Sequence, residues 1–325
     1  MPNWGDVQNE INLQISQHQS MAQQSHDTVR RKYLEQLQQH TNRNIVAYYS
    51  GWLSKQQISG MEINDEDKNG FMMAVHKLDR TKGLDLILHT PGGDIASTQS
   101  IVDYLHKMFD NDIRAVVPQI AMSAGTIIAC SCKEILMGKQ SNLGPIDPQV
   151  RGAPAYGVIR EFRRAVKEIK KDPASVALWQ TIIGKYQPTF LGQCSNAIQW
   201  SNNFVREQLA KVMFVGEAGA NRKAAKIAKQ LADYRKHKTH GRHIHTDECK
   251  AMGLKIMEIE TDQKLQDLIL TVHHCYMHAL MNTGAIKIIE NHLGARLIKQ
   301  QVMLTNPAPF NTMPPRQEVG NSPAS

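Results

Sequence analysis

Two strand–turn–helix units in the middle of the chain constrain its fold more than any other feature. In the first unit, an apolar run at 84–89 leads into a Pro-Gly-Gly turn and then an amphipathic stretch at 95–109. In the second, the β-branched run 113–118 leads into the turn Ala121-Met-Ser-Ala-Gly-Thr126 and then a buried helix. Strands that alternate with helices pair in parallel, so this pattern predicts an α/β fold built on a parallel sheet.

The turns of both units should open at the carboxyl edge of that sheet, where open α/β sheets bind ligands. Ser123 lies in the second turn, and the first N–H groups of the helix that begins near Ala124 have no partner within the helix. Gly92 and Gly93 can bring bare backbone N–H groups toward Ser123 from the first turn. A hydroxyl beside donors for an oxyanion is what acyl transfer requires. The alternative is that Ser123 only caps a helix and that the small residues only allow close packing.

Three motifs resemble the Clp-protease/crotonase superfold: His89-Thr-Pro-Gly-Gly-Asp94, Met122-Ser-Ala-Gly-Thr126 and Leu143-Gly-Pro-Ile-Asp-Pro-Gln149. More narrowly, the chain resembles the signal-peptide-peptidase-like serine peptidases and the serine dehydrogenase proteinase family between residues 65 and 294. The resemblance implies a parallel sheet with flanking helices, assembly into homo-oligomers, and a serine peptidase with a glycine-turn oxyanion hole. It places the nucleophile and the oxyanion hole at Ser123, Gly92, Gly93 and Ala124.

The base that would activate Ser123 is the least determined part of this site. In the signal-peptide-peptidase-like group the base is a lysine downstream of the serine. A lysine serves at neutral pH only where desolvation lowers its pKa, and Lys185 is the candidate because its flanking residues carry no other charge. The rivals are His240 and His243, in a histidine-rich segment before the last predicted strand. Clp-type relatives carry the catalytic histidine where this chain has Asp147, which argues against a triad built in their way.

The composition is that of a globular protein, with 41% hydrophobic and 21% charged residues among 325. No N-terminal stretch has the regions of a signal peptide, and no run approaches the roughly 20 apolar residues of a membrane-spanning helix. We therefore expect a cytoplasmic protein without a transmembrane segment. The five cysteines have no zinc-like spacing, and Cys130 and Cys132, two apart in an apolar run, are expected to be reduced core residues.

Helical patterns flank and interrupt the part of the chain that forms the sheet. A thin apolar stripe predicts one long helix within 1–43, which packs on its own domain or on another subunit. The peptidase domain is expected to span 44–262 and to include a helical insertion at 156–234, where proline residues divide the helices. We expect a helical extension at 263–304 and a disordered, proline-rich tail at 305–325.

Cofactor and partner expectations follow from the same patterns. His274 and His278 stand four apart, as metal ligands can, but no third ligand accompanies them, so we expect no metal and no cofactor. Residues 222–242 hold eight Lys and Arg against Asp233 alone; a solvated helix face explains them better than nucleic-acid binding. The net charge of +8 favours acidic partners without specifying one. The expected partners are a peptide or unfolded-protein substrate, further copies of the chain and a regulatory protein.

Two other functions remain open at the level of the sequence. A crotonase-like acyl-CoA enzyme would use the same oxyanion geometry, but it lacks an evident acidic base and leaves Ser123 without a role. A catalytically silent scaffold that binds protein or nucleic acid would account for the missing Clp-type histidine and for the basic segment. A serine endopeptidase with a Ser123–Lys185 dyad is the function that the motifs favour.

Overall fold

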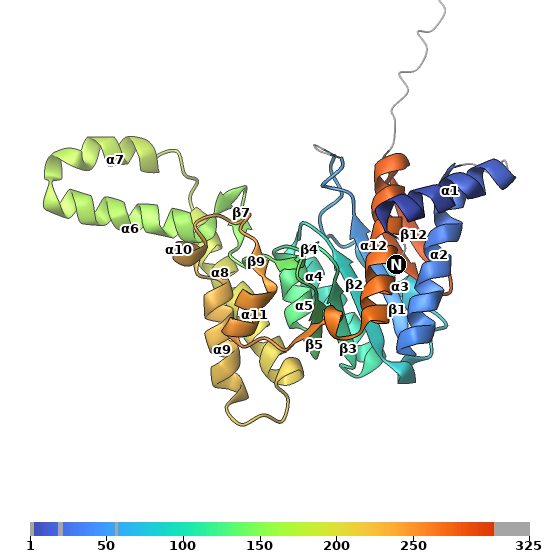
Figure 1. The fold of residues 1–325 in the computed structure, drawn as a ribbon. Helices are drawn as coiled ribbons and strands as arrows, with labels where there is room; N and C mark the ends of the chain where they lie inside the picture. Colours follow the sequence, from blue (N-terminus) through green and yellow to red (C-terminus); the bar gives the residue numbers. More distant parts are fainter. Residues whose placement is uncertain (1–2, 19–21, 56–57, 302–325) are drawn as a thin grey trace, which may run out of the picture.

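A computed structural model of the chain describes residues 3–18, 22–55 and 58–301, and a seven-stranded sheet lies at its centre (Figure 1). Its strands are β1 (Asn44–Ser50), β2 (Leu84–His89), β3 (Ile113–Val117), β5 (Glu134–Met137), β10 (Ile256–Glu258), β11 (Ala285–Asn291) and β12 (Arg296–Gln300). Their order is β10-β5-β3-β2-β1-β11-β12. The first five strands run parallel, whereas β11 is antiparallel to β1 and β12 is antiparallel to β11. The predicted α/β fold with a mainly parallel sheet is confirmed.

Helices cover both faces of this sheet, which is why β1 and β2 are buried along their whole length. Val46 and Tyr48 contribute to the core under α3 (Asp67–Val75), α4 (Ile95–Phe109) and α5 (Ala124–Cys130). Ile45 and Ala47 face the opposite layer, formed by α1 (Trp4–His18), α2 (Ala22–Thr41) and α12 (Gln263–Asn282). None of the described helices has the length and apolar character needed to span a bilayer.

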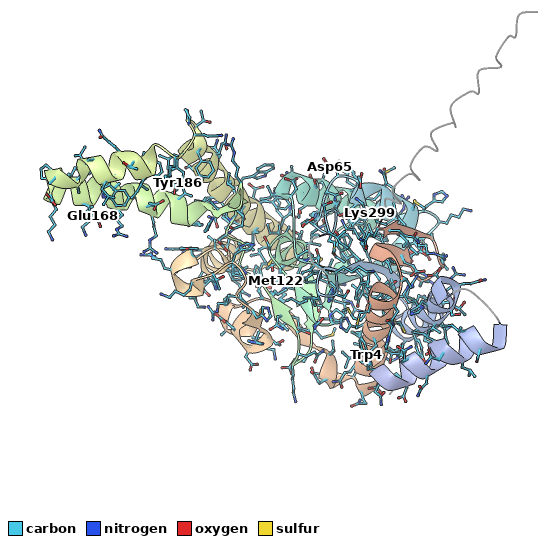
Figure 2. The ribbon with its side chains drawn as sticks, turned by 90° about the horizontal axis from the view of Figure 1, so that it is seen from above. Trp4, Asp65, Met122, Glu168, Tyr186 and Lys299 are labelled. Carbon is cyan, nitrogen blue, oxygen red and sulfur yellow. The ribbon has the colours of Figure 1, made fainter. Side chains whose placement is uncertain are left out.

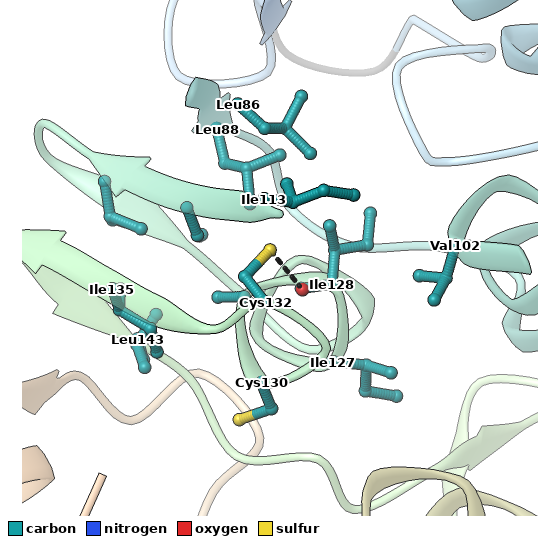
Figure 3. Close-up of a cluster of buried hydrophobic side chains, with 14 of the residues drawn as sticks. Leu86, Leu88, Val102, Ile113, Ile127, Ile128, Cys130, Cys132, Ile135 and Leu143 are labelled. Atoms are coloured by element: carbon teal, nitrogen blue, oxygen red, sulfur yellow. Dashed lines mark hydrogen bonds between the residues drawn. The ribbon is translucent and has the colours of Figure 1, made fainter. Parts of the chain in front are cut away.

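The cysteines belong to the core, as predicted. Figure 3 shows Cys130 and Cys132 among the apolar side chains around α5, where the Cys132 thiol donates a hydrogen bond to the carbonyl of Ile128 at 3.3 Å. All five cysteines are free and buried. Burial raises the pKa of the Cys130 and Cys132 thiols, so neither forms the reactive thiolate at neutral pH.

The N-terminal stripe packs on the chain's own domain. Two helices, α1 and α2, occupy the region where the sequence predicts one, and their apolar residues are buried against α12. A buried ion pair reinforces this packing: Arg30 Nε lies 2.9 Å from a carboxylate oxygen of Glu290 on β11. The stripe therefore serves the fold of a single chain, and assembly is not needed to explain it.

The predicted helical extension at 263–304 is wrong in its second half. Helix α12 ends at Asn282, and the chain then returns as β11 and β12 along the edge of the sheet. The sequence does not predict β11, because Lys287 and Glu290 interrupt its apolar pattern. In the structure both side chains are fully buried and paired with buried partners. The predicted tail at 305–325 lies outside the described residues.

Helical additions form the part of the molecule farthest from α2 (Figure 1). A short hairpin of β7 (Gln149–Val150) and β8 (Ala153–Pro154) leads into α6 (Ala155–Lys171) and α7 (Val176–Ile183). These two helices and the residues that follow α7 project from the body as an arm, which we define as residues 155–186. The chain then returns through α8 (Phe190–Gln208), α9 (Ala220–Leu231), α10 (Tyr234–His237) and α11 (Thr246–Met252).

A buried charge cluster joins β11 to the start of α3. Lys287 Nζ lies 2.7 and 2.9 Å from the two carboxylate oxygens of Asp67, and Tyr48 donates its hydroxyl to the same carboxylate at 2.8 Å. Burial lowers the pKa of Lys287, and the attraction of Asp67 works in the opposite direction. Both charges are buried, so each depends on the other for compensation.

Replacing Lys287 by methionine should therefore lower the free energy of unfolding by about 3–5 kcal/mol, because the substitution leaves the Asp67 carboxylate buried without its cation. Equilibrium urea unfolding measures this change. Lys299→Met on β12 is the matched control, since Lys299 pairs with Glu66 at the surface and such pairs add little stability. Equal effects of the two substitutions would contradict the assignment of the stability to the buried pair.

Candidate active site

A second, three-stranded sheet gathers the segments that carry the candidate site residues. Its strands are β4 (Ile120–Ala121), β6 (Asn142–Leu143) and β9 (Ile244–His245). Ser123 follows β4, Asp147 follows β6 and His240 precedes β9. The pairing of β4 with β6 and of β6 with β9 therefore brings together three residues that are far apart in the sequence.

Ser123 lies between β4 and α5 in a conformation that L-residues rarely adopt. Its φ is 50° and its ψ is −112°, and its side chain makes no hydrogen bond to cap the helix that follows. Backbone strain of this kind costs of order 1–3 kcal/mol and is concentrated at functional sites. A serine on a sharp strand-to-helix turn presents its hydroxyl away from the backbone. The capping role, which was the alternative at the level of the sequence, is therefore not what the structure assigns to Ser123.

The Pro-Gly-Gly turn lies directly against Ser123. Thr90 forms a β-bridge with Ala121, and the N–H of Met122 donates to the Thr90 carbonyl at 3.0 Å. A Cβ atom on Gly92, whose φ is 95°, would lie 2.7 Å from the Cβ of Ser123. Only glycine allows this approach, so the two turns predicted to meet at the sheet edge do meet.

The three amides predicted for the oxyanion hole differ in their availability. The N–H of Gly92 donates to the Thr90 hydroxyl at 3.2 Å, so it is occupied. The N–H of Gly93 has no hydrogen-bond partner in the described part of the chain. Ala124 is the first residue of α5, and its nitrogen would lie 2.9 Å from a Cβ on Gly92, so it faces the turn. Of the three amides, those of Gly93 and Ala124 are therefore the ones without a hydrogen-bond partner in the described part of the chain.

A carboxylate holds one of the candidate bases. The Nδ1 atom of His240 lies 2.9 Å from Oδ1 of Asp147, and the Asp147 side chain is only 1% exposed. The His240 side chain is 29% exposed, so a buried carboxylate orients a ring that remains accessible. Because Nδ1 faces the carboxylate, Nε2 is the nitrogen left to exchange a proton.

A cavity of about 370 Å³ joins the serine turn to this histidine. Pro91 and Met122, the neighbours of the glycine turn and of Ser123, form part of its wall, and His240 and His243 form another part. The remaining lining is Trp52, Leu53, Gln119, Ile120, Asn142 and Gly241. The lining combines apolar side chains with a few polar ones, as the lining of ligand sites does.

Lys185 is not brought to this cavity. It follows α7 on the arm, and its side chain is exposed, whereas the prediction requires a desolvated lysine. Figure 2 shows its neighbour Tyr186 on the arm, well apart from Met122 in the body. Tyr186 stacks on Phe190 of the arm's base. Within one chain, the structure therefore does not give Lys185 the desolvated setting beside Ser123 that a dyad requires, and the Ser123–Lys185 dyad stays a prediction.

The histidine pair considered as a metal site has a different environment. The ring of His278 lies 4.0 Å from the ring of Trp4, and its Nε2 lies 3.1 Å from the Trp4 carbonyl. The ring of His274 meets the same indole edge-on at 5.7 Å. The described residues contain no group of three or more side chains that could hold a metal ion. The pair fastens α1 to α12.

The fold and the serine turn define a ClpP-like serine-peptidase class. The family described as ClpP-like SDH-type serine proteinase matches residues 13–291, and the chain belongs to that family. This membership confirms the resemblance drawn from the motifs and supports a peptidase.

Two relatives from Methanocaldococcus jannaschii match the chain without adding a described activity. The uncharacterized protein MJ0137 is 29% identical over 227 residues, which span 70% of each chain. The uncharacterized protein MJ1495 is 27% identical over 194 residues, which span 60% of this chain and 59% of the relative.

The pairing of Asp147 with His240 is the part of the site that sequence reasoning missed. His240 was a candidate base, but Asp147 was interpreted only as a departure from the Clp-type pattern. The two residues stand 93 apart, and nothing local links them. The available signal was an aspartate at the place of a family histidine, together with a histidine-rich segment before the last parallel strand.

Proposed function

We propose that this protein is a serine endopeptidase with a Ser123–His240–Asp147 triad. The N–H groups of Gly93 and Ala124 form the oxyanion hole. This assignment keeps the predicted nucleophile and replaces Lys185 by His240 as the base. The observation that carries it is a strained serine whose neighbour Met122 lines the same cavity as His240, an imidazole held by a buried carboxylate.

In the first half of the reaction, Ser123 Oγ forms a bond to the peptide carbonyl carbon while His240 Nε2 takes the hydroxyl proton. The carbonyl oxygen gains negative charge and is stabilised by the two backbone donors. Collapse of this intermediate breaks the C–N bond, and His240 gives its proton to the leaving amine. Water then repeats the sequence on the acyl-enzyme, and Asp147 stays ionised throughout, holding the ring and stabilising the imidazolium.

The substrate we propose is an extended peptide or a segment of unfolded protein, because the cavity is open and lined by both apolar and polar groups. Assembly into homo-oligomers is also proposed. The arm supports it, since it exposes Val166 and Leu178 far from the body of the chain. A cytoplasmic location and a regulatory protein partner remain proposals from the sequence.

A fluorophosphonate probe tests the nucleophile, because it reacts only with a serine that a base activates. We expect the probe to label the wild-type chain, mass spectrometry of the digest to place the label on Ser123, and Ser123→Ala to remain unlabelled. Cleavage of an unfolded protein such as reduced casein should follow the same pattern. An unlabelled wild-type protein that also leaves casein intact, at any state of assembly, would refute the proposed activity.

A further inference from the structure

A cavity larger than the one beside Met122 and His240 lies apart from Ser123. Its volume is about 670 Å³, and α6, α8, α9 and α10 enclose it where the arm joins the body (Figure 1). Ala225 and Ala228 of α9 and Ala232, which follows this helix, line the cavity, and their small side chains leave the space open. This volume is within the range of small-molecule binding sites, and the proposed peptidase chemistry does not use it.

Five cationic side chains line this cavity. They are Arg160, Arg163, Arg206, Lys229 and Arg235. The single acidic residue of the lining is Asp233, which is committed to the start of α10, where its carboxylate accepts from the N–H of Arg235 at 3.0 Å. The cavity therefore carries a large excess of positive charge.

The cations inside the cavity differ from those around it in their pairing. Arg164 on the same helix lies 2.6 Å from Glu168, and Lys236 on α10 lies 2.6 Å from Glu248. Within the described residues, by contrast, Arg160, Arg163, Arg206 and Lys229 form no ion pair. A solvated helix face does not account for four unpaired cations that converge on one hollow.

The same cavity wall contains a buried hydrogen-bond acceptor that a ligand could satisfy. Asn202 donates through Nδ2 to the hydroxyl of Tyr156 at 2.9 Å, and both side chains line the cavity. The Oδ1 atom of Asn202 is buried and has no partner in the described part of the chain. A buried acceptor without a partner is costly, and a donor on a bound ligand would satisfy it.

We propose that this cavity binds a small phosphate-bearing molecule of nucleotide size. Its phosphate oxygens contact Arg160, Arg163 and Arg206, since guanidinium groups match phosphate in a bidentate geometry. A hydroxyl or amino group of the same molecule donates to Asn202 Oδ1. Tyr156 and Tyr234 offer aromatic surface for a planar ring. The charge, the volume and the unpartnered amide oxygen together favour this class of ligand over a bare inorganic anion.

Isothermal titration calorimetry with the full chain tests this proposal, with magnesium-free ATP, tripolyphosphate and adenosine as probes. We expect ATP to bind, and Arg163→Gln and Arg206→Gln each to weaken its binding about tenfold or more, as loss of a charged hydrogen bond does. The matched controls Arg164→Gln and Lys226→Gln, which remove neighbouring cations outside the cavity, should leave the affinity unchanged. All four side chains are exposed, so these variants should fold.

The probes also distinguish the sources of binding energy. We expect ATP to bind more tightly than tripolyphosphate, because the tyrosines and Asn202 contribute; tripolyphosphate that binds as tightly as ATP would overturn the assignment of a nucleotide-sized ligand. Adenosine should not bind detectably. The Ser123→Ala variant should bind ATP like the wild type. The binding test is therefore independent of whether the proposed peptidase activity is found. The proposal is overturned if neither phosphate probe binds at millimolar concentration, if the control variants weaken binding equally, or if a single-stranded oligonucleotide binds far more tightly through the same arginines.

Discussion

Replacing His240 by glutamine should lower kcat/KM for peptide cleavage by about 10⁴-fold or more, because the serine then has no group to accept its proton. The rate of fluorophosphonate labelling should fall with it, since labelling needs the same activated hydroxyl. Substrate binding should change little, because His240 forms only part of the cavity wall. Steady-state kinetics on a fluorogenic peptide separates the two effects, and circular dichroism checks that the variant remains folded.

Lys185→Gln is the control for this variant. Lys185 is exposed on the arm, so its loss should leave kcat/KM unchanged if the base is His240. The reverse outcome, with loss of activity in Lys185→Gln and retention in His240→Gln, would contradict the triad. It would then require the arm of a second copy to deliver the lysine, and the sequence-based dyad would hold between subunits.

Asp147→Asn should lower kcat by about 10⁴-fold without a comparable change in KM. The substitution keeps the shape of the side chain but removes the charge that fixes the His240 ring through Nδ1 at 2.9 Å. An amide can offer its N–H to Nδ1, which leaves Nε2 protonated and unable to act as a base. Wild type and variant should therefore differ in kcat while they bind a non-hydrolysable peptide equally.

Asp247→Asn provides the matched substitution, because Asp247 is an exposed carboxylate in the first turn of α11. It should not change kcat. If the Asp147→Asn variant keeps the wild-type kcat, the Asp147 carboxylate has only a structural role. This result would also show that the Asp147 charge is not needed to orient the His240 ring.

The sequence sufficed where the evidence is local. Each of the two key turns lies between a strand and a helix that follow one another directly, so the serine turn at Ser123 and the glycine turn at 91–93 could be located from composition and spacing. Their meeting followed from the rule that neighbouring parallel strands end at one edge of a sheet. The backbone confirms it through the bridge between Thr90 and Ala121.

The remaining features depend on contacts that no local pattern encodes. Ser123, Asp147 and His240 are brought together by strands of two residues each, which are too short to show a periodicity in the sequence. Strand β11 escaped notice because buried charges interrupt its apolar pattern, and their partners Asp67 and Arg30 come from the opposite end of the chain. Lys185 is exposed and not desolvated as expected, because an uncharged sequence neighbourhood does not imply burial.

The residue before Asp147 is clamped from two sides: the N–H of Ile146 donates to the carbonyl of Leu231 on α9, and its carbonyl accepts from the hydroxyl of Ser201 on α8. A shortened enzyme that kept both turns but deleted the helices between them and the last strand would lose this clamp. Helices α8 and α9 can therefore not be deleted to obtain a smaller peptidase. Their hydrogen bonds to Ile146 fix the position of the Asp147 carboxylate.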